Sequence, residues 1–332
     1  MLSLSQTFFF LFQGKTLKWS NSKQEEMFNT STVTEFQLLG FSKIQELQIV
    51  HFVMFLVIYL VTLMGNFLII SVIFLNPHFH TPMYFFLVNL AVADLGAISV
   101  TIPKSMTYVR TISYTGCAAQ VFFLIFFMAV DVSLLTVMAY DRFVAICEPL
   151  HYSVVMSRES CVKMAIIAWA SGLLYGSVHV GGTFSITFCS NIINQFFCEI
   201  PQILKLSCSD LYLIEIGILV FSAFVVFSCF IFIIISYVQI FKAVMKIPSM
   251  KGRQKTFSTC LPHLIVVSLF ICICAFAYLK PISRCPSDFD LVITVIYCSL
   301  PFMMNPIIYC IRNKDIQTAL WKFLNHLTIT LV

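Results

Sequence analysis

Three polar side chains lie inside long apolar stretches of this chain, where an ionisable group is costly unless it has a partner or a function. Asp94 stands in LVNLAVADLGA, Asp131 in FMAVDVSLL and Asn66 in TLMGNFLII. Two carboxyl groups that lie close together in a low dielectric cannot both stay charged without a cation, so they would share a proton or a sodium ion. The sequence thus predicts a proton or sodium site here. The alternative is that each group is separately hydrogen-bonded and inert.

A charged pair, Asp141 and Arg142, follows a long apolar run and precedes further apolar residues. Arg142 lies 11 residues beyond Asp131, about 16 Å along a helix, which places it at a membrane boundary. Adjacent residues do not face each other on a helix, so Asp141 can bind Arg142 only if the long side chain bends back. The pair is either a weak, exchangeable latch or a simple interfacial arginine.

A proline inside another apolar run marks a third candidate, in the sequence Asn305-Pro306-Ile307-Ile308-Tyr309. Proline removes a backbone hydrogen bond and weakens the helix, and Asn305 or water can satisfy the freed carbonyl groups. Both a moving hinge and a static kink fit this pattern.

Seven apolar runs must position these residues. Hydrophobic residues make up 59% of the 332 and charged residues only 11%, which is too apolar for ordinary soluble domains. Runs of roughly 20 apolar residues suffice to cross the hydrocarbon as helices, in which every backbone polar group is paired. The sequence predicts an all-α membrane protein, a seven-transmembrane helix bundle over residues 49–311. The runs cover residues 49–75, 82–101, 118–137 with helix through 146, 164–180, 216–240, 260–279 and 289–311.

Basic residues set the predicted orientation. They gather between the fifth and sixth runs and after the seventh, and short loops rich in lysine and arginine stay in the cytoplasm. Residues 1–48 are therefore predicted to be an extracellular segment, of which 1–26 are either a disordered extension or the product of an upstream start that is not used. Residues 312–332 are predicted to be a cytoplasmic tail with a short amphipathic helix. Asn29 in Asn29-Thr30-Ser31 becomes a candidate N-glycosylation site.

Thirteen cysteines divide by the side of the membrane on which they fall. Cys117, Cys189, Cys198 and Cys208 lie on the outer side, in an oxidising compartment, and can form two disulfides. Four cysteines allow three pairings, which the sequence alone does not separate.

The combination resembles the rhodopsin-like G-protein-coupled receptors and, within them, the olfactory receptors. Asn66, Asp94, Trp169, the pair at 141–142 and the stretch 305–309 match the general receptor pattern. The olfactory branch is indicated by HTPMYFFL at 80–87, MAYDRFVAIC at 138–147, FSTCLPHL at 257–264, Ser236-Tyr237 and the loop with three cysteines. The resemblance covers about residues 29–324.

The resemblance implies an odorant receptor at the plasma membrane that activates an olfactory-type, stimulatory heterotrimeric G protein and raises cyclic AMP. Arg142 would meet the G protein when helix six swings outward, Asp141 would hold Arg142 back, and Tyr237 and Tyr309 would hold the open state. The implied disulfides are Cys117–Cys198 and Cys189–Cys208. The sequence departs from the family's usual residues at three positions, Asp131, Phe143 and Ile271.

The family's architecture also implies a ligand site among the outer halves of helices three, five, six and seven. The implied lining is Leu124, Ile125, Met128 and Ala129, then Phe221, Ser222 and Val225, then Ala275 and Tyr278, then Thr294 and Cys298. This mostly apolar set suits a small, neutral, largely hydrophobic ligand with one hydrogen-bonding group. Helix three carries no acid at its outer face to bind an amine. The alternative for each of these residues is simple packing.

The sequence fits a transporter or an enzyme less well than a receptor. A proton-coupled transporter would show inverted repeats and paired broken helices, and the runs show neither. An enzyme would need a nucleophile with a base or a metal cluster, whereas His179 and His263 stand on separate runs. A related receptor for a non-odorant small molecule in another tissue remains an alternative. The expected partners are a volatile odorant, the G protein and membrane lipid, without nucleic acid. No cofactor or metal is expected, apart from a sodium ion as an option.

Overall fold

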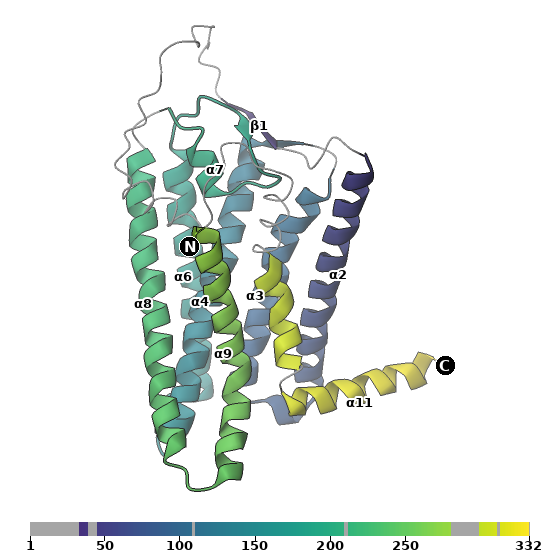
Figure 1. Ribbon diagram of the computed structural model, residues 1–332, viewed down its shortest axis with the longest axis vertical. Helices are drawn as coiled ribbons and strands as arrows, with labels where there is room; N and C mark the ends of the chain where they lie inside the picture. Colours follow the sequence, from purple (N-terminus) through teal and green to yellow (C-terminus); the bar gives the residue numbers. More distant parts are fainter. Residues whose placement is uncertain are drawn as a thin grey trace.

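The computed structural model describes residues 33–38, 45–107, 110–208, 212–279, 299–310 and 313–331. Its long helices run side by side as a bundle with a loop-rich cap at one end (Figure 1). Among the described residues, six helices are long and apolar enough to cross a membrane. They are α2 (Gln45–Leu75), α3 (Pro82–Ser105), α4 (Tyr114–Cys147), α6 (Arg158–Phe184), α8 (Tyr212–Met245) and α9 (Met250–Leu279). The predicted helical membrane bundle is confirmed.

The seventh predicted run, 289–311, is described only in part. Residues 299–310 are helical, and the earlier part of the run lies outside the described residues. The six long helices extend past the predicted runs; α9, for example, begins at Met250 rather than at residue 260. Hydropathy marks only the length inside the hydrocarbon, whereas a helix can continue into water with polar side chains.

A small sheet lies at the capped end, a name we use for the end of the bundle that carries β1 (Glu35–Leu38), β2 (Thr111–Ser113) and β3 (Ile192–Ile193). The strand order is β2-β1-β3, with β1 antiparallel to β2 and parallel to β3. Side chains of β1 alternate between exposed and buried, and Phe36 is fully buried. The segment before the first helix is thus the central strand that joins two loops. This sheet was not predicted from the sequence, because strands of two to four residues leave almost no periodic pattern.

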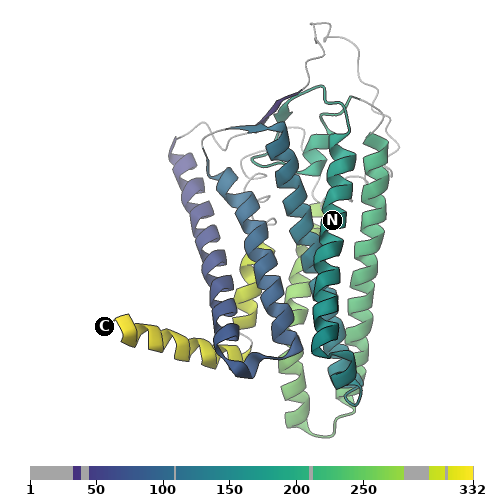
Figure 2. The same cartoon turned by 180° about the vertical axis from the view of Figure 1, so that it is seen from behind.

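Helix α4 runs through the middle of the bundle, against α3, α6, α8 and α9 (Figures 1 and 2). Its close approach to α6 depends on Gly172, where an added Cβ would lie 2.6 Å from Val130 Cγ2 and 2.9 Å from the Phe126 carbonyl oxygen. On α6, Trp169 donates a hydrogen bond from Nε1 to Asn89 Oδ1 of α3, at 3.0 Å. Together these contacts fix α3, α4 and α6 as one packed unit.

The chain leaves the bundle in α11 (Lys314–Leu331), which points away from the helix axes (Figures 1 and 2). Asn313 begins it, because its Oδ1 accepts hydrogen bonds from the backbone amides of Asp315 and Ile316. Its apolar residues Ile316 and Ala319 are buried, whereas the polar residues Lys314, Asp315 and Gln317 are exposed. The predicted amphipathic C-terminal helix is therefore confirmed.

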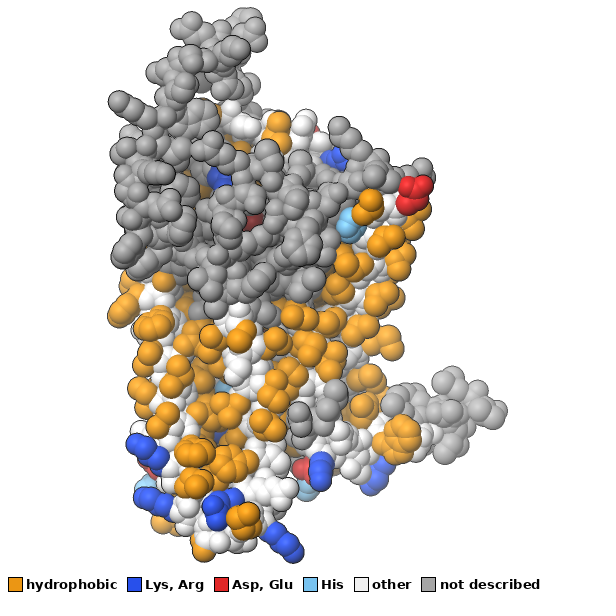
Figure 3. Space-filling model, viewed as in Figure 1, with side chains coloured by type: hydrophobic (Ala, Val, Ile, Leu, Met, Phe, Trp, Pro, Cys, Tyr) orange, Lys and Arg blue, Asp and Glu red, His pale blue; other side chains and the backbone are white. Residues whose placement is uncertain are grey.

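Hydrophobic and basic side chains occupy different parts of the bundle surface. Hydrophobic side chains cover its middle, and lysine and arginine side chains gather at the end opposite the cap, around the connection between α8 and α9 (Figure 3). We call this the basic end. An apolar band bordered by charge is what a multi-pass membrane protein presents to lipid.

Candidate ligand-binding site and its connections

A cavity of about 190 Å³ lies between α4, α6, α8 and α9, beneath the loop that holds Cys198. Its lining is almost entirely apolar, with a few hydroxyl groups and one carboxyl group, as ligand pockets usually have. Six residues of the predicted ligand site line it: Leu124, Ile125, Met128, Ala129, Ser222 and Val225. The spacing of three and four residues on α4 and α8 places them on the faces that meet.

Phe221 lies elsewhere than expected. Its side chain is 67% exposed and does not line the cavity. One residue on a helix is a rotation of about 100°, so a helix that turns Ser222 inward must turn Phe221 outward. Of the remaining predicted residues, Thr294 and Cys298 lie outside the described residues, as do the side chains of Ala275 and Tyr278.

The cavity also contains polar groups that the sequence analysis did not assign to it. On α6, Ser171, Tyr175 and His179 recur at four-residue spacing and all line the cavity. Residues four apart share one face of a helix, so these polar residues in an apolar run could have been predicted to lie together. Glu199 reaches the same cavity from the loop after α6, and only 8% of it is exposed. The cavity wall therefore includes an acid, although not one on α4.

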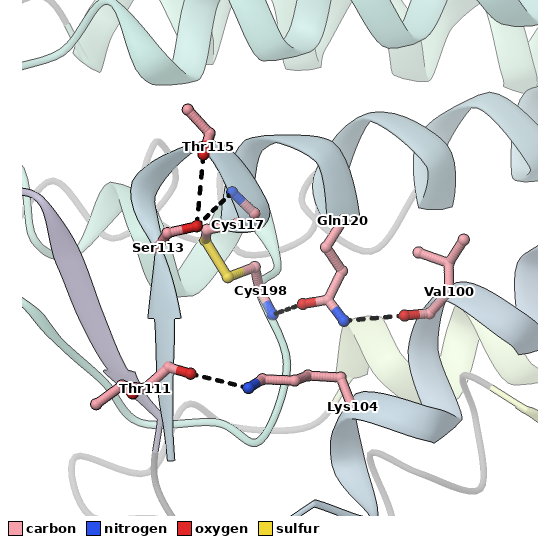
Figure 4. Close-up of a disulfide and its surroundings, with 9 residues drawn as sticks. Val100, Lys104, Thr111, Ser113, Thr115, Cys117, Gln120 and Cys198 are labelled. Atoms are coloured by element: carbon pink, nitrogen blue, oxygen red, sulfur yellow. Dashed lines mark hydrogen bonds between the residues drawn. A yellow bond between two sulfur atoms is a disulfide. The ribbon is translucent and has the colours of Figure 1, made fainter. Parts of the chain in front are cut away.

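Two disulfides hold the loop above the cavity. Cys117 of α4 is bonded to Cys198, and Cys189 to Cys208, which are the pairings that the family resemblance implied. Gln120 fixes the same point: its Oε1 accepts a hydrogen bond from the Cys198 amide at 2.9 Å, and its Nε2 donates to the Val100 carbonyl of α3 at 3.0 Å (Figure 4). The position of Glu199, one residue further, is set by these bonds.

The short helix α7 (Ile200–Leu204) is followed by Lys205, which interacts electrostatically with Glu199. Burial lowers the pKa of Lys205, and the neighbouring Glu199 carboxylate partly opposes that shift. Lys205 also donates a hydrogen bond to Gln202 Oε1 at 3.1 Å. The positive charge of Lys205 thus partly compensates the negative charge of Glu199 within the same loop.

The three polar residues of the predicted proton or sodium site occupy the interior of the bundle, and all are buried. Asn305 Nδ2 donates to both oxygens of Asp94, at 3.1 and 3.0 Å. Asn66 donates instead to the carbonyls of Thr62 and Phe302. Within the part of the chain that is described, neither carboxyl oxygen of Asp131 has a hydrogen-bond partner.

Helix packing around Asn305 depends on its neighbour in sequence. The Pro306 ring lies against Gly65 of α2, where an added Cβ would be 3.0 Å from the proline Cγ. A larger residue at position 65 would push the two helices apart. The polar cluster is therefore closed on one side by a tight contact between backbone and ring.

At the basic end, Asp141 is 1% exposed and accepts a 2.9 Å hydrogen bond from the Tyr152 hydroxyl. Among the described residues, no ion pair within 4.0 Å joins Asp141 to Arg142. The direct latch between them is thus not formed, because the carboxylate faces α5 (Tyr152–Val155) rather than its neighbour in sequence. Burial and the Asp141 charge both raise the pKa of Tyr152 above its ordinary value, so the phenol keeps its proton.

A second connection joins three helices at this end. The Tyr237 hydroxyl of α8 lies 2.8 Å from His263 Nδ1 of α9, and His263 Nε2 lies 3.0 Å from the Leu135 carbonyl of α4. Because a carbonyl only accepts, Nε2 carries the proton, and the neutral ring accepts from Tyr237 at Nδ1. Tyr309, also buried, has no hydrogen-bond partner for its hydroxyl within the described residues.

Comparison with known proteins points to a single family. The family model described as "Olfactory receptor" matches residues 55–326. The chain is 50% identical over 299 residues to Olfactory receptor 14A16 of Homo sapiens, a match that covers 89% of this chain and 96% of that receptor. It is also 50% identical over 301 residues to Olfactory receptor 14I1 of Homo sapiens, covering 89% and 97%. Olfactory receptor 5B21 of Mus musculus is 44% identical over 304 residues, covering 90% and 95%.

The chain belongs to the olfactory receptor family. This olfactory receptor is therefore a G-protein-coupled receptor by family and not an enzyme, as the sequence analysis expected. The transporter alternative has no support from these relatives. Two histidines that the sequence analysis treated as isolated have specific places in the receptor: His179 lies at the cavity and His263 in the connection between α4, α8 and α9.

Proposed function

We propose that this receptor binds small, mostly hydrophobic odorants in the cavity between α4, α6, α8 and α9, and that it activates a stimulatory, olfactory-type G protein, which raises cyclic AMP. One observation carries the proposal. Helix α4 lines the cavity as far as Ser133 and meets His263 at Leu135, and α9 lines the cavity with Phe270, two helical turns from His263. A ligand that repacks these helices can therefore act on Arg142 without touching it.

The proposed orientation places the capped end outside the cell and the basic end in the cytoplasm, at the plasma membrane. The lysines and arginines around the α8–α9 connection support it, because such residues stay on the cytoplasmic side. Asn29, the candidate glycosylation site, lies outside the described residues. A glycosidase-sensitive mobility shift that Asn29→Gln abolishes would establish the outer location of the amino terminus, and epitope accessibility in unpermeabilised cells would establish it without the glycan.

The proposal includes a bound sodium ion or a shared proton at the buried carboxyl groups of Asp94 and Asp131. Asp131 is 2% exposed with both oxygens lacking partners among the described residues, and its charge acts on Asp94. A sodium ion would supply positive charge to the two acids, and Asp94, Asp131 and Asn66 are the residues that would hold it. A shared proton would satisfy the same two acids without an ion. Titrating sodium chloride against choline chloride at constant ionic strength, with the thermal stability of the purified receptor as readout, separates the two forms.

The expected potency of an agonist follows from how far it must shift the equilibrium between the closed and open states. To move a receptor from 1:99 to 99:1 in favour of its open state, a ligand must bind that state about 5.5 kcal/mol better than the closed one. A molecule of about a dozen heavy atoms gains little differential free energy, so we propose broad responses at micromolar concentrations. A highly efficacious nanomolar agonist would contradict this part of the proposal.

The deciding experiment measures cyclic AMP in cells that express the receptor with the olfactory-type G protein. Volatile esters, alcohols, ketones and acids are the test compounds, and Arg142→Ala is the control variant, with surface expression measured for both. A response that disappears in Arg142→Ala at equal surface expression supports the proposal. Silence of a well-expressed receptor toward the whole panel would count for the alternative, a receptor of a non-volatile small molecule.

A further inference from the structure

The cavity contains one pair of deeply buried polar side chains that bond to each other. His179 Nε2 of α6 and Ser222 Oγ of α8 lie 2.9 Å apart, and each residue is only 2% exposed. Both line the cavity. A polar pair at the wall of an apolar pocket orients a ligand, since its hydrogen-bonding capacity is costly to leave unused.

Only one proton lies on the line between these two atoms, which determines what the pair can offer. If His179 Nε2 carries the proton and donates it to Ser222, the serine hydroxyl proton is free to turn toward the cavity. If Ser222 donates to the ring, the hydroxyl oxygen can accept instead. The pair can therefore donate a hydrogen bond to the oxygen of a ligand without breaking a backbone hydrogen bond of either helix.

The other serines of the lining are different. Ser133 donates to the Ala129 carbonyl at 2.9 Å, and Ser171 donates to the Ala168 carbonyl at 2.8 Å. The two hydroxyl oxygens also lie 3.3 Å apart, so the single proton of each hydroxyl is already used in a bond within the protein. These two residues can accept hydrogen bonds from a ligand but cannot donate without losing their own.

A charge limits which oxygen-containing ligands fit. Glu199 lines the same cavity and is mostly buried, where repulsion between like charges is weakly screened. A ligand carboxylate would be repelled by this acid, because Lys205, which partly compensates the charge of Glu199, does not line the cavity, whereas a neutral carbonyl group has no net charge to be repelled. The arrangement favours an uncharged acceptor over an anion.

We infer that the His179–Ser222 pair is the specificity-determining anchor of the cavity, and that it selects neutral ligands with a hydrogen-bond-accepting oxygen, such as ketones, aldehydes and esters. This inference rests on the proposed function for its biological meaning. The oxygen bonds to the pair, and the hydrocarbon part lies against the apolar residues of α4 and α8, among them Met128 and Val225.

The test compares methyl ketones of six to ten carbons with the matching 2-methyl-1-alkenes, in which a CH₂ group replaces the oxygen, and with straight-chain carboxylic acids. Ser222→Ala and His179→Leu remove the anchor, and His179→Gln keeps an amide donor. Val225→Ala is the matched control, because it removes only apolar contact from the same face of α8. Cyclic AMP dose–response curves give the potency of each compound.

We expect ketones to be more potent than their alkenes, and Ser222→Ala and His179→Leu to reduce ketone potency about three- to tenfold, the size of one hydrogen bond. His179→Gln should restore part of the loss. Val225→Ala should weaken ketones and alkenes alike. Equal potency of ketones and alkenes, a loss in Ser222→Ala that is the same for ketones and alkenes, or a preference for carboxylic acids would overturn the inference while leaving the receptor function intact.

A receptor without any cyclic AMP response is tested by ligand-induced thermal stabilisation of the purified protein, with the same compounds. Stabilisation by ketones that Ser222→Ala abolishes would support the anchor even though coupling to the G protein had failed. No stabilisation by ketones, or stabilisation that both variants of the pair retain in full, would overturn it.

Discussion

The two ends of the bundle are held by bonds of different kinds. At the capped end, two disulfides, a three-stranded sheet and the Gln120 hydrogen bonds fix the loop above the cavity. At the basic end, single hydrogen bonds connect the helices, from Tyr152 to Asp141 and from Tyr237 through His263 to Leu135. Covalent bonds persist at thermal energies, whereas one hydrogen bond contributes only about 0.5–1.5 kcal/mol and can be exchanged for another.

This difference suits a receptor that must recognise at one end and rearrange at the other. A pre-formed cap reduces the conformational entropy that a ligand must remove on binding. Weak, exchangeable connections keep the closed and open arrangements of α9 within a few kcal/mol of each other, so that a small ligand can shift their populations. Variants at the two ends of the bundle test this contrast.

Breaking the Cys117–Cys198 bond should have the largest effect. Its sequence separation is 81 residues, against 19 for Cys189–Cys208, so loop entropy predicts losses of about 4–5 and about 3 kcal/mol in the free energy of unfolding. Alanine at both cysteines of each pair, with thermal unfolding and surface expression as readouts, gives the comparison. A larger loss for the shorter loop would show that loop entropy does not govern the cap.

Removing the central aromatic side chain of the sheet should be next. Phe36 is fully buried and contacts the rings of Tyr114 and Phe188, with centroid distances of 6.0 and 5.6 Å. Phe36→Ala should cost about 3 kcal/mol, the lower part of the range for a buried phenylalanine, and should weaken ligand binding. Phe74→Ala is the control, because that side chain is 69% exposed. Equal thermal stability of the two variants would mean that β1 does not support the cap.

His263→Leu should act at the basic end and change signalling more than folding. The variant loses both hydrogen bonds that tie α9 to α4 and α8, and an outward movement of α9 would have to break the same bond to Leu135. A loss of about 1–2 kcal/mol from the closed state corresponds to a five- to thirtyfold change in its population ratio. Cyclic AMP without ligand should rise accordingly.

Thr259→Ala provides the matched control on the same helix, because the bonds of its hydroxyl, to the Thr256 carbonyl and to Cys260, stay within α9. Its ligand-free cyclic AMP should equal that of the unmodified receptor. If His263→Leu also left the ligand-free signal unchanged at equal surface expression, the Tyr237–His263–Leu135 connection would not oppose activation.

Tyr152→Phe should have the smallest effect. It removes one hydrogen bond from the buried Asp141 carboxylate and should lower the free energy of unfolding by about 1 kcal/mol. The raised pKa of Tyr152 means that this stabilisation is fully present below the ordinary tyrosine pKa and is lost only as the pH rises through the higher folded value. The stability difference between the two proteins should therefore be constant between pH 6 and 9. A difference that declines within that window would contradict the bond.

The membrane-spanning helices, the family and most of the cavity-lining positions on α4 could be predicted from the amino-acid sequence. Length and continuity of apolar runs suffice for the helices, because a bilayer requires every backbone polar group to be paired within its segment. Positions such as Leu124 and Met128 followed from helical spacing and the family pattern. The disulfide pairing required the resemblance as well, since the cysteines alone allowed three pairings.

Which polar groups contact each other could be seen only in the folded bundle. His179 and Ser222 are 43 residues apart and His263 and Leu135 are 128 apart, and nothing in the local sequence connects the members of either pair. Asp141 bonds to Tyr152 instead of its neighbour Arg142, and Phe221 turns outward while Ser222 turns inward. The physical reason is the same in each case. Periodicity determines that a helix has an inner face, but the rotation of each helix and its partners across the bundle depend on packing among all the helices together.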